Sequence, residues 1–281
     1  MPHSIKQNLS DIEYHASPAI GSTTAKIGID NEPLLAMALL GKYKQEDKAH
    51  FVSGRLAHMA VLEPARFNEL VIADGPINER TGNPYGRDTL KFQVWKDQNP
   101  DVTMVDKWIY DSLETMPVSV RNIFSHGAAE ESYFHGNGKY EIKCRPDWTH
   151  HDKAHFYDLK TIATKGGNIE RAIDRQISNL KYWFSLAWYR HVIELVTGKR
   201  YTHSFIFVEK EPPHRWRIVD IDFDYIALGG EEVKRVMRIL DRFYDCAIEQ
   251  RQTVLRDAEE DIYHQSQCPS YLLWDESEGD E

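Results

Sequence analysis

The sequence contains few cysteines, and their placement excludes two kinds of stabilised fold. Only Cys144, Cys246 and Cys268 occur among 281 residues. Because their number is odd and they lie far apart, the sequence predicts neither a disulfide framework nor a CxxC-type zinc or cluster site. No apolar run approaches the roughly 20 residues that cross a bilayer. Residues 1–15 also lack the apolar core of a signal peptide, so we expect a cytoplasmic protein with no membrane association.

The signatures of several enzyme classes are also absent. The chain has neither the GxSxG of serine hydrolases nor a GxxxxGK[ST] phosphate-binding loop. His150, His151, Asp152 and His155 lie close together, and imidazoles suit Zn²⁺. No second cluster with zinc-site spacing accompanies them, so we interpret this stretch as the polar turn of a hairpin.

Positive charge is in deficit, and the net charge of the chain is −10. Proteins that bind nucleic acid usually show an excess of basic residues instead. However, residues 257–281 carry nine of the acidic residues and no Lys or Arg, which leaves a net charge of −1 for the rest of the chain. We therefore expect an acidic C-terminal tail at 257–281 and a nearly neutral body that can still present a basic groove.

The stretch from Cys144 to Thr161, CRPDWTHHDKAHFYDLKT, contains the most informative side chains. It predicts two short strands joined by a polar turn. Side chains two positions apart on a strand face the same way, so Asp158 and Lys160 project together, and the hairpin brings Asp147 beside them. Two carboxylates and an ammonium group at strand ends suit a divalent-metal phosphodiesterase site. The carboxylates would hold Mg²⁺, and the lysine would position or deprotonate the attacking water.

The order of the predicted elements indicates an α/β fold, with a central mixed sheet flanked by helices. A helical N-terminal part at 1–125 precedes a core at 126–225, in which apolar periodicity predicts one long helix at 169–196. A C-terminal helix follows at 230–250. We expect these parts to form a single domain at 1–256.

Three further features have two interpretations each when the residues alone are considered. Glu130 is either a third carboxylate from a neighbouring strand or an ordinary surface glutamate. His58 lies on a predicted helix, where a lone histidine is more often a core or surface residue than a ligand. Arg80 and Arg87 lie in a loop at 76–87 that is rich in Gly, Pro and Asn, and this loop either contacts phosphate or is simply solvated.

The chain also resembles a known family, and the resemblance rests on six stretches in order. YHASPAIGST, SGRLAHMAVLEP, NERTGNP, AEES, CRPD and DLKT resemble the successive motifs of the RecE-type, or exonuclease VIII-type, DNA exonucleases. These enzymes belong to the PD-(D/E)xK nuclease superfamily, which includes the phage lambda exonuclease. The likeness covers most of residues 10–250 and is far more specific than a D…DxK pattern alone. It implies a PD-(D/E)xK, restriction-endonuclease-like core.

Carried over residue by residue, the resemblance implies a metal site. Asp147, Asp158 and His58 would bind Mg²⁺, or Mn²⁺ as a substitute, together with the backbone carbonyl of Leu159. Lys160 would act on the nucleophilic water. His58, which on its own would be interpreted as a core or surface residue, thereby becomes a candidate metal ligand.

The resemblance also favours Glu130 as a nearby acidic group, but one motif departs from the family pattern. The family usually has a Gln followed four residues later by a Tyr on the helix after the lysine. Here the best-placed match is Asn179 with Trp183, and Gln176 is an alternative with poorer spacing. The residues that we expect to contact DNA are Arg80, Arg87, Arg145, Thr161, Gln176 and Trp183.

The activity that the resemblance implies is a Mg²⁺-dependent exonuclease. It would degrade one strand of linear double-stranded DNA from 5′ ends and leave 3′ overhangs for homologous recombination, as in phage-type systems. A ring-like homo-oligomer, trimer or tetramer, and a single-strand-annealing recombinase as partner are implied as well. The alternatives are another PD-(D/E)xK nuclease, such as an endonuclease or a Cas4-like nuclease, and a catalytically weakened DNA-binding protein on the same fold.

Overall fold

The computed structural model describes residues 3–44, 50–70, 75–247 and 250–251. The expected acidic tail at 257–281 lies outside the described residues. Within the described ranges, no helix has both the length and the apolar character needed to cross a membrane.

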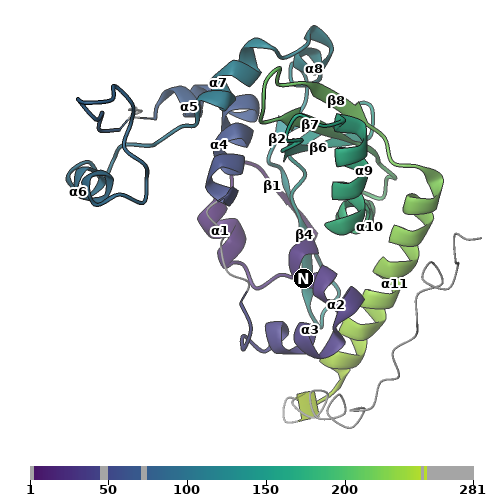
Figure 1. The fold of residues 1–281 in the computed structure, drawn as a ribbon. Coiled ribbons are helices and arrows are strands. Elements are labelled where there is room, and N and C mark those ends of the chain that lie inside the picture. Colours follow the sequence, from purple (N-terminus) through teal and green to yellow (C-terminus); the bar gives the residue numbers. More distant parts are fainter. Residues whose placement is uncertain (1–2, 45–49, 71–74, 248–249, 252–281) are drawn as a thin grey trace, which may run out of the picture.

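A mixed five-stranded sheet forms the centre of the protein (Figure 1). In their order across the sheet, the strands are β2 (Ala128–Ala129), β5 (Trp148–His150), β6 (His155–Ile162), β7 (Thr202–Glu209) and β8 (Trp216–Val219). β6 and β7 are parallel, whereas the other neighbouring strands are antiparallel. The β5–β6 pair is the hairpin that the sequence predicts, so the expected mixed sheet is confirmed.

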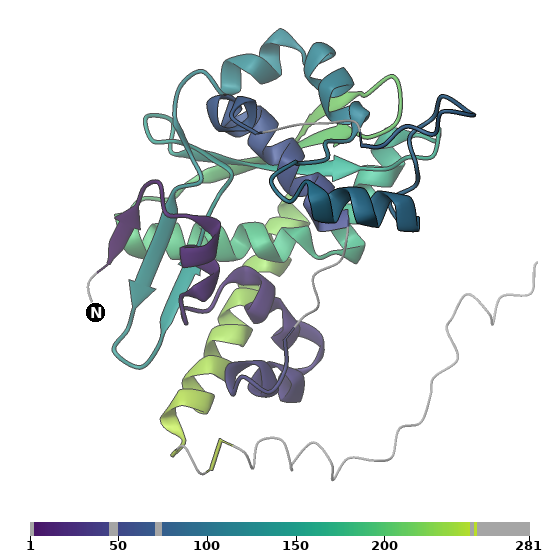
Figure 2. The same cartoon turned by 90° about the vertical axis from the view of Figure 1, so that its left-hand side faces the viewer.

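A second, three-stranded antiparallel sheet adjoins the first (Figure 2). It consists of β1 (Ser4–Lys6), β3 (Ser132–Gly136) and β4 (Glu141–Cys144). β1 is a short strand within the N-terminal part expected to be helical, and it was not predicted because short strands carry little sequence signal. The chain passes from β2 in the larger sheet to β3 in the smaller one, and returns from β4 to β5. These two crossings between the sheets, β2 to β3 and β4 to β5, therefore lie side by side.

The two faces of the large sheet are buried under different helices. Side chains alternate along β7, so Phe205 and Phe207 pack on one face, whereas Ile206 and Val208 pack on the other with Val120. The helices of the first face are α9 (Ile169–Asn179), α10 (Tyr182–Thr197) and α11 (Phe223–Asp245). The helices of the second face are α4 (His50–Leu62), α7 (Lys107–Glu114) and α8 (Val118–Ile123). Burial on both sides explains the nearly continuous apolar run of β7.

The single helix expected at 169–196 is wrong, because the chain breaks between α9 and α10. Leu180 ends α9, and Lys181 adopts a left-handed backbone conformation with φ 49°. Tertiary contacts hold this break: Lys181 pairs with Asp30, and the carbonyl of Leu180 accepts a hydrogen bond of 2.9 Å from Lys26. The apolar periodicity continues across the break, so the sequence conceals it.

The C-terminal helix expected at 230–250 begins earlier and ends sooner, at Phe223 and Asp245. Asp222 caps its first turn, because its side chain accepts a hydrogen bond of 3.0 Å from the N–H of Tyr225. α11 packs along α10 and also meets the N-terminal helices (Figure 1). The remaining helices are α1 (Asp11–Ala16), α2 (Ser22–Asp30), α3 (Glu32–Leu39), α5 (Pro64–Asn68) and α6 (Leu90–Gln98).

Candidate metal centre and its groove

Asp147 lies where the chain enters β5 from the small sheet, and its carboxylate is the centre of the candidate site. The residue is only 8% exposed. Its Oδ2 accepts a hydrogen bond of 2.6 Å from the backbone N–H of Leu159 on β6. Its Oδ1 lies 3.5 Å from Nδ1 of His58, which α4 contributes. The hairpin therefore fixes the carboxylate against β6, while a helix distant in sequence supplies the imidazole.

Glu130 joins these two residues from the other crossing between the sheets. The ligand atoms of His58, Glu130 and Asp147 all lie within 4.8 Å of one another. The backbone of Glu130 is left-handed, with φ 51°, and its N–H donates to the carbonyl oxygen of Asp147 at 3.1 Å. Non-glycine residues adopt this conformation only when their surroundings impose it. The paired crossings thus hold Glu130 against Asp147.

Asp158 and Lys160 lie two positions apart on β6, and their side chains form an ion pair. Asp158 is buried, and the Lys160 Nζ also donates to the carbonyl oxygen of Leu159 at 3.4 Å. The carboxylate of Asp158 is not part of the three-residue group around Asp147. Of the expected metal ligands, His58 and Asp147 thus lie together, whereas the carboxylate of Asp158 faces Lys160.

Burial and mutual repulsion raise the pKa of two of these carboxyl groups. Burial is the main cause for Glu130, and the Asp147 charge adds to it, so that its pKa rises to about 8. Burial likewise raises the pKa of Asp158, although Lys160 opposes the shift. Both carboxyl groups therefore need a nearby positive charge to be ionised at low cost.

The remaining groups are shifted towards their charged forms. Burial would raise the pKa of Asp147, but His58 outweighs it and the pKa falls below its usual value. The same contact raises the pKa of His58, despite burial. Asp158 raises the pKa of Lys160, again against burial. The lysine is thus a cation that can orient a water molecule or stabilise an anion, rather than a base.

These residues fit a divalent cation. Carboxylate oxygens are the ligands that Mg²⁺ and Mn²⁺ prefer, and an imidazole is acceptable to Mn²⁺. The pKa of Glu130 is raised mainly by burial, with the charge of Asp147 adding to the shift, and a bound cation would offset both effects. His58, Glu130 and Asp147 would hold the ion, with Asp158 close by.

The break between α9 and α10 decides which side chains reach the site from these helices. Gln176 donates from Nε2 to the carbonyl oxygen of Thr161 at 3.2 Å and to Oη of Tyr182 at 3.1 Å. The Lys160 amino group lies 5.3 Å from the centre of the Tyr182 ring. Asn179 is exposed at the groove wall, whereas Trp183 is only 6% exposed and packs in the core. Trp183, one of the expected DNA contacts, is therefore a core residue, whereas Gln176, the alternative match, reaches the groove beside Tyr182.

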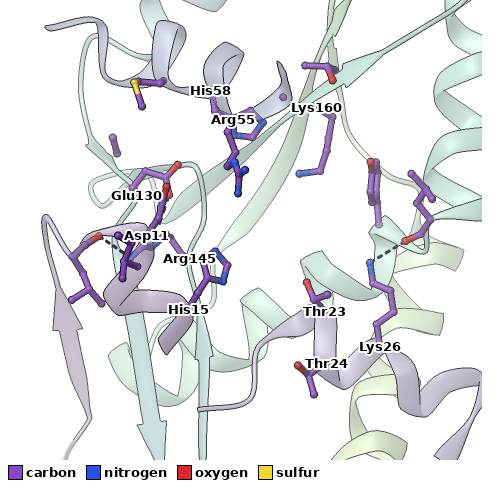
Figure 3. A pocket seen from close by; sticks show the side chains of 18 of the residues that line it. Asp11, His15, Thr23, Thr24, Lys26, Arg55, His58, Glu130, Arg145 and Lys160 are labelled. Carbon is purple, nitrogen blue, oxygen red and sulfur yellow. Dashed lines mark hydrogen bonds and ion pairs between the residues drawn. The ribbon is translucent and has the colours of Figure 1, made fainter. Parts of the chain in front are cut away.

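A groove of about 2650 Å³ opens above these residues (Figure 3). Its walls come from α1 and α4 on one side, and from α2 and the α9–α10 junction on the other. Among the residues that the structure describes, eight Lys and Arg line it, against four Asp and Glu. In a chain of net charge −10, this local excess of positive charge suits a polyanionic ligand.

The expected DNA-contacting arginines lie in two different settings. Arg80 and Arg87 lie away from the groove, and Arg87 pairs with Asp106 at 2.6 Å. Arg145 lines the groove but is buried, and its guanidinium donates to Ser132, to the carboxylate of Asp11 and to the backbone of residue 9. Its contacts indicate that it fastens the N-terminal segment. Thr161 does line the groove.

The histidines of the β5–β6 turn point to separate partners. His150 contacts the carbonyl oxygen of residue 123 at 2.8 Å, His151 lies 2.8 Å from the carboxylate of Glu131, and His155 contacts Thr202 at 2.7 Å. They form no metal-binding group among the residues that the structure describes. This arrangement supports the interpretation of the stretch as a polar hairpin turn.

Among the groove residues that the sequence analysis did not identify are Arg55, Lys26 and Tyr182. Burial and the charge of Lys160 lower the pKa of Lys26 to about 8. Arg55 precedes His58 by three positions, a spacing that places both on one helix face and could have identified it. The positions of Lys26 and Tyr182 at the groove depend on the break between α9 and α10, and this break leaves no signal in the sequence.

Comparisons with known proteins agree with this architecture. Residues 31–255 match the family described as "PDDEXK-like domain of unknown function (DUF3799)". A protein from Eubacterium rectale described as "Putative exonuclease" has a similar fold, with a TM-score of 0.57 and 12% identity over 95% of this chain and 98% of that chain. No protein among the curated sequences matches the chain. The mixed sheet flanked by helices is a PDDEXK-like nuclease fold.

Proposed function

Because the chain belongs to the family of PDDEXK-like domains of unknown function (DUF3799), we propose that it is a divalent-metal-dependent nuclease. One observation carries the proposal. The ligand atoms of His58, Glu130 and Asp147 lie within 4.8 Å of one another, next to Asp158 and Lys160, at the base of a groove with excess positive charge. A cation site beside a phosphate-attracting surface is what phosphodiester hydrolysis requires.

Each residue has a separate role in this proposal. A bound Mg²⁺ or Mn²⁺ would supply Lewis-acid chemistry, which stabilises charge on the phosphoryl oxygens. Asp147 and Glu130 would hold the ion with His58, and the Leu159 N–H keeps the Asp147 carboxylate in place. Lys160, held as a cation by Asp158, would orient the attacking water and stabilise the developing negative charge.

The finer proposal is an exonuclease acting on linear double-stranded DNA in the 5′-to-3′ direction, with a role in homologous recombination. The ordered motifs support it, and so does the description of the Eubacterium rectale protein as an exonuclease. A ring-like homo-oligomer, a single-strand-annealing partner and a cytoplasmic location belong to the same proposal. The one-domain organisation of residues 1–256 is part of it as well.

The test is cleavage of duplex DNA labelled at its 5′ or 3′ ends, with Mg²⁺ or Mn²⁺. Asp158→Asn and Lys160→Met should each lose at least about a hundredfold in rate. Matched controls come from the turn between the same two strands: Asp152→Asn and Lys153→Met alter exposed side chains and should keep wild-type rates. Equal activity in all four variants would refute the site.

Substrate topology separates the proposed exonuclease from the alternatives. An exonuclease needs an end, so a covalently closed circle should resist it while the linear form is degraded. Cleavage of the circle would favour an endonuclease instead. If DNA binds without any cleavage, and calorimetry detects no Mg²⁺ or Mn²⁺ binding, the protein is a DNA-binding protein on this fold.

A further inference from the structure

Arg55 is an exposed guanidinium on the wall of the groove, with no partner among the described residues. It lies on α4, and its side chain projects into the groove towards the region between Glu130 and Lys160 (Figure 3). Within residues 3–44, 50–70, 75–247 and 250–251, it forms no hydrogen bond or ion pair. An unpaired arginine beside a candidate catalytic centre is therefore available to a ligand.

Four other cations of the groove are already engaged by the protein. Lys160 pairs with Asp158, and Lys181 pairs with an aspartate of α2. Arg145 is buried in a hydrogen-bond network, and Arg66 pairs with a glutamate at 3.1 Å. Each of these side chains would have to give up an existing contact in order to bind an anion. Arg55 would not.

The position of Arg55 on α4 relates it directly to the metal centre. It lies three residues before His58, so both side chains leave the same face of the helix, about one turn apart. Its charge also acts across the groove, where it helps to lower the pKa of His15, although burial is the main cause of that shift. The guanidinium is thus directed into the groove at the level of the candidate site.

We propose that Arg55 binds a non-bridging oxygen of the phosphate under attack, opposite the metal centre. This inference rests on the nuclease function proposed above and assigns the residue that grips its substrate. When the water oxygen bonds to phosphorus, the bond to the leaving sugar oxygen breaks with its electron pair. The water gives up a proton to solvent, and the leaving oxygen gains one. Arg55 neutralises the negative charge that the phosphoryl oxygens carry during this step.

Arginine suits this role better than lysine does. Its planar guanidinium donates two parallel hydrogen bonds to one phosphate, and it is charged at every relevant pH. A lysine at this position would supply a point charge without the second hydrogen bond. Arg55→Lys is therefore expected to restore part of the function that Arg55→Ala loses.

The first experiment measures single-turnover cleavage of duplex DNA by the full chain. Arg55→Ala should slow cleavage by about a hundredfold or more, and Arg55→Lys should lie between that variant and the wild type. Arg121→Ala is the matched control, because Arg121 is exposed on α8 and does not line the groove; its rate should stay within about twofold of wild type. Unchanged cleavage by Arg55→Ala would overturn the inference.

The second experiment asks which phosphate Arg55 contacts, and it needs no cleavage. Binding is measured with Ca²⁺ in place of Mg²⁺, on duplexes in which single linkages near each end are replaced in turn by uncharged methylphosphonate. At the linkage that Arg55 contacts, the methylphosphonate should weaken DNA binding by the wild type and by Arg121→Ala. It should not weaken binding by Arg55→Ala any further, because this variant has already lost the contact. Equal losses in all three proteins at every linkage would overturn the inference.

The outcomes separate this inference from the proposed function. A wild-type protein that cleaves DNA, with Arg55→Ala as active as Arg121→Ala, refutes the role of Arg55 alone. A wild type that cleaves no DNA with either Mg²⁺ or Mn²⁺ refutes the nuclease. In that case the binding experiment still decides whether Arg55 grips a phosphate.

Discussion

Acidification should weaken one buried ion pair at the end of β7, and the structure allows the loss to be calculated. Glu209 is only 1% exposed. It accepts hydrogen bonds from Nε and Nη2 of Arg215, both of 2.7 Å, and a further one from the hydroxyl of Thr164. Thr164 follows β6, so this carboxylate ties together the ends of the two central parallel strands, one of which carries Asp158 and Lys160.

The hydrogen bonds from Arg215 lower the pKa of Glu209 from 4.5 to about 2, with Thr164 assisting and burial opposing. A depressed pKa in the folded state means that the ionised carboxylate stabilises the fold. That stabilisation is complete well above pH 4.5 and is lost as the pH falls towards 2. The full value is about 3 kcal/mol, of which a little under half is lost between pH 7 and pH 3.5.

Urea unfolding of the wild type and of Glu209→Gln measures this quantity. At pH 7 the variant should be less stable by about 2–3 kcal/mol, and the difference should shrink by about 1 kcal/mol at pH 3.5. Glu114→Gln is the control, because Glu114 is exposed and makes no side-chain hydrogen bond among the described residues. A difference between wild type and Glu209→Gln that is the same at both pH values would refute the reasoning.

Three other predictions follow from the site and from the helix that supports it. Glu130→Gln should unfold at an equal or higher temperature than wild type in the presence of a chelator, because burial raises the pKa of this carboxyl group to about 8; Mg²⁺ at ten times its Kd should then stabilise only the wild type, by about 1.4 kcal/mol in thermal scans, because Glu130 is one of the three grouped candidate ligands. Tyr182→Phe should slow single-turnover cleavage by about fivefold, since it removes the hydrogen bond of 3.1 Å that positions Gln176. Gly229→Ala should lower the free energy of unfolding by about 1–3 kcal/mol, because its new Cβ would lie 2.8 Å from the Cβ of a residue on α10. The neighbouring Gly230→Ala meets nothing within 4 Å and should instead raise it by about 0.5–1 kcal/mol in the same urea titration.

The parts of the site that could be predicted from sequence are those that local alternation determines. Asp147, Asp158 and Lys160 lie on one hairpin, and a strand period of two is enough to bring them together. His58 is different, because nothing local distinguishes it from an ordinary helix histidine. Only the ordered motifs of the whole chain selected it, and the structure places its Nδ1 3.5 Å from Asp147.

The break between α9 and α10 could not be predicted, for a physical reason. Apolar residues continue at helical spacing through it, and neither glycine nor proline marks it. Lys181 is left-handed because the surrounding structure holds it, with Asp30 on its side chain and Lys26 on the preceding carbonyl. Such tertiary support is invisible in a local pattern. The result is that Tyr182, rather than Trp183, faces Lys160.

The net charge of the chain and the charge of its groove have opposite signs, and this contrast has a consequence for association. Of the acidic residues that the structure describes, only four line the groove, compared with eight Lys and Arg. The acidic excess therefore lies elsewhere. Within roughly a Debye length, about 8 Å at physiological salt, the acidic surfaces outside the groove repel a polyanion, while the groove attracts it. A DNA molecule would thus be oriented before contact, with its backbone directed towards Arg55 and the metal centre. An acidic protein can bind DNA when its few unpaired cations are gathered in one place.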